Sequence, residues 1–175
     1  MNGNKVDRGD RVEPVKIRLA EKADLDAINE IYNYYVANST CTYQLEPEPA
    51  SGRERWFDEH GPAHPVTVAL SGGQIVGWGA ISRFHPRAAY ARSVENSIYV
   101  RPECFGRGIG RALLADLIER ARQAGHHTII ALIDAEQPRS IALHAKAGFA
   151  QAGRIREAGY KFGRWLDVVY MQLML

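Results

Sequence analysis

Apolar and polar residues alternate along this chain with two periods, and the period changes several times. In the first half, a short apolar run predicts a strand over residues 16–20, and apolar residues three or four positions apart predict a helix over residues 23–37. Ser51 and Glu54 have the spacing of a capping box, which predicts the start of a second, shorter helix. Two apolar runs then flank a Ser-Gly-Gly sequence, which indicates a β-hairpin over residues 66–81.

The second half continues the alternation of strands and helices. A continuous apolar run over residues 128–133 is typical of a buried central strand, and Gly125 ends the helix before it. We predict strands over residues 93–100, 128–133, 149–161 and 165–173. Helices are predicted over residues 113–121 and 138–147, the first before and the second after the buried strand. The complete order is β-α-α-β-β-β-α-β-α-β-β, which predicts a mixed α/β protein.

Composition limits the class of protein but does not identify it. The 175 residues, 46% of them apolar and 24% charged, suit one globular domain, expected over residues 17–175. The polar residues 1–16 lack periodicity and are expected to form a flexible N-terminal arm. A net charge of +2 without a basic block gives no reason to expect a nucleic-acid partner.

The sequence also bears on compartment and metal binding. No apolar run approaches 18 residues and no leader-like segment is visible, so we expect no membrane partner and a cytoplasmic location. Two cysteines, Cys41 and Cys104, do not make a disulfide framework. The six histidines lack the spacing of metal ligands, so we expect no metal.

A glycine-rich segment between a predicted strand and a predicted helix carries the most chemical information. Gly106, Gly108 and Gly110 leave the backbone free to surround an anion, and the following helix start adds unpaired N–H groups and the positive end of its dipole. The segment is neither a P-loop, because no Lys-Ser or Lys-Thr pair follows, nor a dinucleotide fingerprint, because the glycine spacing differs. It therefore predicts a cradle for a pyrophosphate.

Glu95 lies on the strand that leads into this cradle. A carboxylate there suits a proton acceptor for an amine, which is mostly protonated near neutral pH. A carboxylate that is simply exposed on the strand, or paired with an arginine such as Arg92, is the alternative interpretation. The sequence leaves both open, although we favour the catalytic role.

The loop resembles the acetyl-CoA loop of the GCN5-related N-acetyltransferases (GNAT), written R/Q-x-x-G-x-G/A. Gly108 and Gly110 occupy its glycine positions, whereas Phe105 departs from Arg or Gln. The order of elements over residues 17–175 is also that of the family. The resemblance implies the GNAT fold, a mixed and mostly antiparallel sheet of about seven strands flanked by about four helices and splayed at the cofactor site. It also implies acetyl-CoA as co-substrate.

The same resemblance implies which residues bind the cofactor. The free backbone of the strand pairs with the pantetheine amides in this family. Gln137 stands where relatives often have Asn, and Ser140 is placed to reach a cofactor oxygen. The expected cofactor-binding residues are Ile98, Tyr99, Val100, Phe105, Gly106, Arg107, Gly108, Ile109, Gly110, Arg111, Gln137 and Ser140.

Three separate segments resemble the phosphinothricin and methionine sulfoximine N-acetyltransferase branch: residues 38–47, 93–100 and 158–168. That branch acetylates the α-amine of a small amino acid or analogue, and its members are often homodimers. The resemblance implies that His144 protonates the leaving thiolate or helps to accept the amine proton; a helix histidine packed on the next strand is the alternative. An acceptor carboxylate suits arginine, so we expect substrate-binding residues at Tyr43, Arg87, Tyr90 and Arg92.

Two other functions stay open at this point. One keeps acetyl-CoA but uses a protein or peptide amine as the acceptor, and the other is a CoA-binding module without turnover. The Arg and Tyr residues before Glu95 favour a small carboxylated acceptor over a peptide. Glu95 and His144 argue against a module without turnover, whereas Phe105 and Gln137 keep it open.

Overall fold

The computed structural model describes residues 14–175, so most of the predicted N-terminal arm lies outside the described residues. Seven strands and four α-helices follow the predicted order: β1 Lys16–Leu19, α1 Leu25–Asn38, α2 Ala50–Asp58, β2 Val66–Ser71, β3 Gln74–Arg83, β4 Ser93–Val100, α3 Ile109–Gln123, β5 Thr128–Asp134, α4 Pro138–Lys146, β6 Ala150–Lys161 and β7 Arg164–Met174. Within these residues, no helix has both the length and the apolar character needed to cross a membrane.

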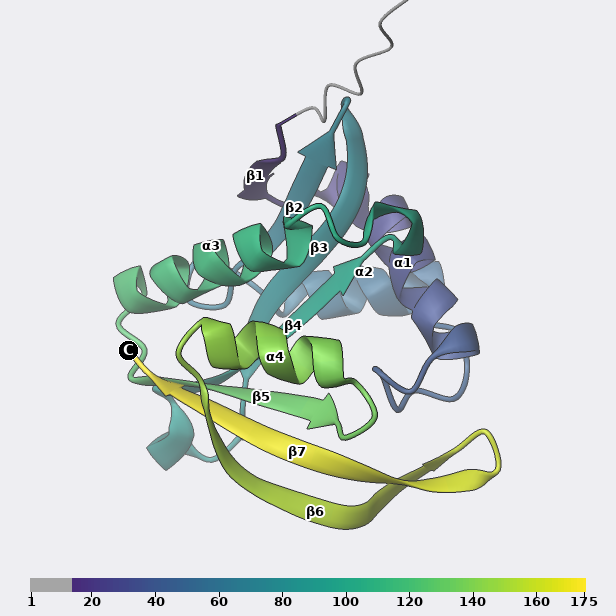
Figure 1. The fold of residues 1–175 in the computed structure, drawn as a ribbon. Coiled ribbons are helices and arrows are strands. Elements are labelled where there is room, and N and C mark those ends of the chain that lie inside the picture. Colours follow the sequence, from purple (N-terminus) through teal and green to yellow (C-terminus); the bar gives the residue numbers. More distant parts are fainter. Residues whose placement is uncertain (1–13) are drawn as a thin grey trace, which may run out of the picture.

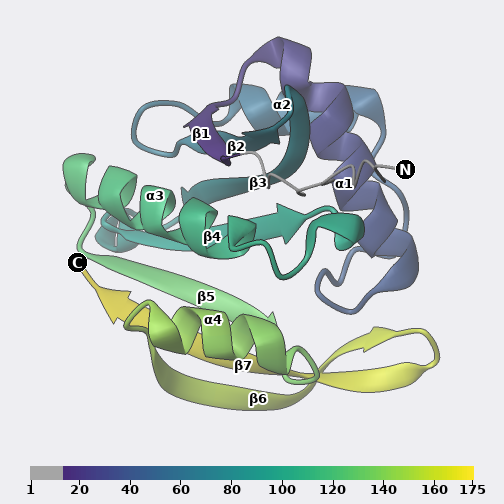
Figure 2. The same cartoon turned by 45° about the horizontal axis from the view of Figure 1, so that its top comes forward.

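All seven strands join one sheet in the order β1-β2-β3-β4-β5-β7-β6. Every neighbouring pair is antiparallel except β4 and β5, which run parallel. Helices α1 and α2 cover one face, and α3 and α4 cover the other (Figures 1 and 2). The predicted mixed, mostly antiparallel sheet with four helices is confirmed.

Apolar side chains fill the space on both faces of the sheet. On one face, Ile28 and Ile31 of α1 pack with Trp78 of β3. On the other, Leu114 and Leu117 of α3 pack against β4 and β5. The apolar stripe of α3 and the apolar run of β5, both predicted from the sequence, are therefore the surfaces that pack together. Their burial supplies most of the driving force for this packing.

The predicted capping box at Ser51 is wrong. Helix α2 begins two residues earlier, at Ala50 with Pro49 as its N-cap, and the Pro49 carbonyl accepts the N–H groups of Gly52 and Arg53. The neighbouring Glu48 is tied to α1, since Asn33 accepts its N–H and both Asn29 and Asn33 donate to its carbonyl. This tertiary anchor decides where the chain turns into the helix, so the Ser51 side chain has no capping role.

Candidate active site

The sheet opens between its two parallel strands. The ladder from β4 to β5 runs only over Ser93–Glu95 on β4, and the two strands then separate (Figure 2). A cavity of about 1290 Å³ lies at this fork. Glu95 is the last residue of β4 that pairs with β5, and it lines the cavity. The predicted splay is thus present at the predicted carboxylate.

Side chains alternate along β4 and give the cavity two different ends. Tyr99 faces the α1 and α2 layer, where it stacks on Trp78 with ring centroids 4.8 Å apart. Ile98 faces α3 instead. We call the part lined by Tyr32, Arg53, Trp56, Trp78 and Tyr99 the aromatic end, and the part lined by residues 104–106 and 108–111 the glycine-loop end. Because Glu95 shares the face of Tyr99, it points toward the aromatic end.

The glycine-loop end has the geometry of an anion site. Gly106 and Gly108 both have φ near +79°, a conformation that glycine adopts without strain, and Gly108 is the N-cap of α3. The first bond of α3 joins the Ala112 N–H to the Gly108 carbonyl, so the N–H groups of the three residues before Ala112 have no partner within the helix. These groups and the helix dipole favour a phosphate.

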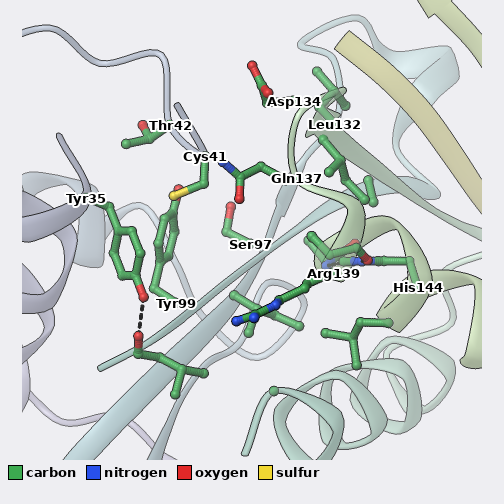
Figure 3. Close-up of a pocket in the computed structure, with 18 of the residues that line it drawn as sticks. Tyr35, Cys41, Thr42, Ser97, Tyr99, Leu132, Asp134, Gln137, Arg139 and His144 are labelled. Carbon is green, nitrogen blue, oxygen red and sulfur yellow. Dashed lines mark hydrogen bonds between the residues drawn. The ribbon is translucent and has the colours of Figure 1, made fainter. Parts of the chain in front are cut away.

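Two cations add to this end. Arg111 lies in the first turn of α3, and Arg139 lies at the start of α4; both line the cavity. Figure 3 shows the Arg139 side chain extending from α4 across the cavity. Phe105, Gln137 and Ser140 also line the cavity, as expected, whereas Arg107 is exposed and does not. Arg139 was not predicted to be part of the site.

The free edge of β4 differs from the expectation at one residue. The Arg101 N–H donates to the Val76 carbonyl, 2.8 Å away, and this bond fixes which β4 residues face β3. Ile98 and Val100 direct their N–H and C=O groups into the gap, but the backbone of Tyr99 faces β3. The Tyr35 hydroxyl donates to the Val100 carbonyl (Figure 3). The edge therefore offers Ile98 and the Val100 N–H, while Tyr99 contributes its ring.

Glu95 is partly buried, and no ion pair of Glu95 exists among residues 14–175. Burial raises the pKa of its carboxyl above the usual range, because desolvation disfavours the charged form. The alternative ion pair with Arg92 is not formed. A carboxylate with a raised pKa at the edge of a cavity is a suitable proton acceptor.

His144 lines the cavity but does not fit the predicted role as an acid. Its side chain is buried, with 4% exposure. Its Nδ1–H donates to the Ser140 carbonyl at 2.9 Å, since a carbonyl can only accept, and its Nε2 then accepts from Asn96 Nδ2 at 3.0 Å. Burial lowers its pKa, which keeps the ring neutral. Neither nitrogen is free to give a proton, so the packed-histidine alternative fits better.

The loop over residues 38–49 is fastened to the C-terminal strands. The Tyr43 hydroxyl donates to Asp134 Oδ2 at 3.0 Å, and Asp134 is itself buried. The buried Lys161 donates from Nζ to the carbonyls of Ser39 and Thr42, both at 2.8 Å. Tyr43 lines the cavity, as predicted. The two bonds from Lys161 hold the loop in place.

Three predicted substrate-binding residues lie away from the cavity. Arg87, Tyr90 and Arg92 are exposed, and none of them is among the described residues that line it. They precede Ser93, the first residue of β4, whereas the cavity is lined by later residues of that strand. The arginines expected to bind the acceptor carboxylate therefore lie at the N-terminal end of β4, away from the cavity.

A different arginine, which the sequence pattern did not indicate, lies at the cavity. Arg53 is only 4% exposed and lines the aromatic end. Trp56 follows it by three residues, a spacing that places both side chains on one face of α2. An arginine and a tryptophan on one face of a helix are equally consistent with an exposed pair, so the sequence signal for a buried arginine is weak. Within the described residues, no group of three or more His, Cys, Asp or Glu is placed to bind a metal.

Comparison with known proteins agrees with this geometry. The family model described as "Acetyltransferase (GNAT) family" matches residues 28–149. An L-methionine sulfoximine/L-methionine sulfone acetyltransferase of Pseudomonas aeruginosa is 40% identical over 161 residues, which cover 91% of this chain and 94% of the relative.

Two solved structures are similar over nearly the whole chain. A GNAT superfamily phosphinothricin acetyltransferase from Sinorhizobium meliloti, solved in complex with AcCoA, has a TM-score of 0.89 and 40% identity, covering 92% of this chain and 88% of its own. A ribosomal-protein-alanine N-acetyltransferase from Brucella melitensis has a TM-score of 0.89 and 41% identity, covering 91% and 99%.

Proposed function

The chain belongs to the acetyltransferase (GNAT) family, and from this membership we propose that it transfers the acetyl group of acetyl-CoA to the α-amine of a small amino acid or analogue of the methionine sulfoximine and phosphinothricin type. One observation carries the proposal. The sheet opens directly after Glu95, so a partly buried carboxylate lies beside a cavity with an anion cradle at its other end.

The residues at the glycine-loop end fit acetyl-CoA. The unpaired N–H groups at the start of α3, with Arg111 and Arg139, hold its phosphates. The free N–H and C=O groups of Ile98 and the N–H of Val100 pair with the amides of its pantetheine arm. When bound, the co-substrate supplies an acetyl group activated as a thioester.

Glu95 performs the proton transfer on the acceptor. It removes a proton from the ammonium group, directly or through a water molecule, and leaves a neutral amine. A bond then forms between the amine nitrogen and the carbonyl carbon, and the bond from that carbon to sulfur breaks. The thiolate leaves with the electron pair, and the second proton of the amine nitrogen, lost as the amide forms, reaches the sulfur through water; a thiol with a pKa of about 8.5 is mostly protonated at neutral pH. His144 keeps Asn96 in position and holds its proton on Nδ1.

A protein acceptor is the second candidate, because one similar structure carries the name ribosomal-protein-alanine N-acetyltransferase. The loop that Tyr43 and Lys161 fasten over the aromatic end favours a small acceptor. Thiol release is measured with acetyl-CoA and methionine sulfoximine, methionine sulfone, phosphinothricin, the common amino acids and an alanine-initiated peptide. Release with the small acceptors is expected. Release only with the peptide supports the second candidate, and no release supports a CoA-binding module.

We also propose that the protein is a homodimer in the cytoplasm. The β6–β7 hairpin exposes three aromatic side chains, Tyr160, Phe162 and Trp165, at 55% to 61%, and apolar groups gathered on one hairpin suit an interface between copies. Light scattering tests this: a dimer is expected, and Trp165→Lys shifts it toward the monomer. The two free thiols suit a reducing compartment, which cell fractionation tests.

A further inference from the structure

A buried arginine forms the floor of the aromatic end. The Arg53 Cζ atom lies 4.5 Å from the ring centroids of both Tyr32 and Trp56 and 5.5 Å from that of Trp78. Its Nε–H donates to Asn29 Oδ1 at 3.2 Å. The rings stabilise the cation through its faces, so the Nη edge is the part of the group still free to bind.

The charge of Arg53 has no close counter-ion. Among residues 14–175, no carboxylate lies within 4.0 Å of it, and neither Nη atom makes a hydrogen bond. Glu48 is the carboxylate whose charge acts on it, but that side chain accepts a bond from Gln44 instead. Burial lowers the pKa of Arg53, as expected for a desolvated cation. A buried charge without a partner is costly.

The cavity is the place from which a counter-ion can come. Arg53 and Glu95 both line it, and Glu95 points toward the same aromatic end. A guanidinium with its faces covered and Nε occupied presents a fixed pair of N–H donors, which match the two oxygens of a carboxylate. An α-amino acid carries its carboxylate next to the amine, so one molecule can reach an arginine and a proton acceptor at once.

We propose that Arg53 binds the α-carboxylate of the acceptor and so selects amino acids over simple amines. This assignment rests on the proposed function and replaces the predicted roles of Arg87 and Arg92. The acceptor carboxylate completes the hydrogen bonding of the Nη groups, and its amine is held toward Glu95. Acceptor recognition thus depends on a charge that the fold leaves unpaired.

The test combines a substitution in the protein with removal of the carboxylate from the acceptor. Rates are measured for the wild-type protein and Arg53→Gln with methionine sulfone and with 3-(methylsulfonyl)propan-1-amine, which lacks only the carboxylate. For the wild-type protein, removal of the carboxylate is expected to lower kcat/KM roughly 10- to 100-fold, as for a lost charge-assisted pair. In Arg53→Gln, kcat/KM for methionine sulfone falls by a similar factor, while that for the amine changes less than about threefold.

Controls separate binding from folding. Arg55→Gln removes an exposed charge from the same helix and is expected to leave all rates unchanged. Calorimetry with CoA and a thermal melt verify that each variant is folded; if Arg53→Gln does not fold, Arg53→Lys, which keeps the charge but not the fork, carries the same comparison. Equal losses for both acceptors overturn the inference. No turnover by the wild-type protein with either acceptor contradicts the proposed function instead.

Discussion

The two ends of the cavity are built from different parts of the chain. The glycine-loop end is mainly backbone: the N–H groups at the start of α3, two glycines with positive φ, and the free edge of β4. The aromatic end is made of side chains from α1, α2, β3 and β4. Backbone groups are present whatever the side chain, so the first end is expected to tolerate substitutions that keep the backbone conformation, and the second end is expected to depend on its side chains.

This difference explains the two departures from the family pattern. Phe105 and Gln137 replace the residues common in relatives, and both still line the cavity. Neither supplies the backbone donors, so the anion cradle is intact. The aromatic end instead depends on single side chains, above all Glu95 and Arg53.

The largest expected effect comes from Glu95→Gln. Loss of the proton acceptor is expected to lower kcat roughly 100- to 10,000-fold, while the affinity for CoA stays the same, because Glu95 belongs to the aromatic end. Steady-state kinetics and calorimetry with CoA give the two values. Unchanged turnover shows that Glu95 is structural, and a parallel loss of CoA affinity breaks the separation of the two ends.

Gly108→Val acts on the other end. At φ near +79° a β-branched residue is strained, so the loop is expected to leave the cradle geometry, and CoA binds roughly 5- to 30-fold more weakly. The space around Gly108 is open, so strain rather than a clash is the cause. Gly61→Val is the control, because Gly61 has open space and no positive φ. Equal CoA affinity of both variants and the wild-type protein contradicts the cradle.

The pH profile sharpens the assignment of Glu95. Its pKa is raised, so the carboxyl is protonated, and inactive as an acceptor, over a range where an ordinary glutamate is charged. Turnover is therefore expected to fall about tenfold per pH unit below that pKa and to level off above it. Measured kcat against pH shows this low-pH limb. Its persistence in Glu95→Gln assigns it to another group.

The smallest effect is expected from Phe105→Gln, which restores the family residue. Phe105 is half exposed and the backbone donors stay in place, so CoA affinity is expected to change less than about threefold. Calorimetry measures it. A tenfold gain shows that a side chain at position 105 contributes as much as the backbone, and the contrast between the two ends is then lost.

Most of the fold follows from local patterns. The order of elements and the strand over residues 93–100 were predicted, because burial of apolar stripes and the turn residues between them act over short distances. The start of α2 was not, because the anchor at Glu48 comes from α1. Likewise, His144 was predicted to be reactive because the sequence does not show the two groups that occupy its ring nitrogens.

The sequence by itself determined the backbone of the glycine-loop end, since glycines, a helix start and the strand before them are contiguous and their chemistry is local. Only the tertiary structure decided the aromatic end. Charge and residue type suggested Arg87 and Arg92, which lie near Glu95 in the sequence, yet the sheet directs that loop away from the cavity. Arg53 reaches the cavity because α2 packs over β3. Burial of its charge depends on this packing between distant segments, so it cannot be predicted from a short stretch of sequence.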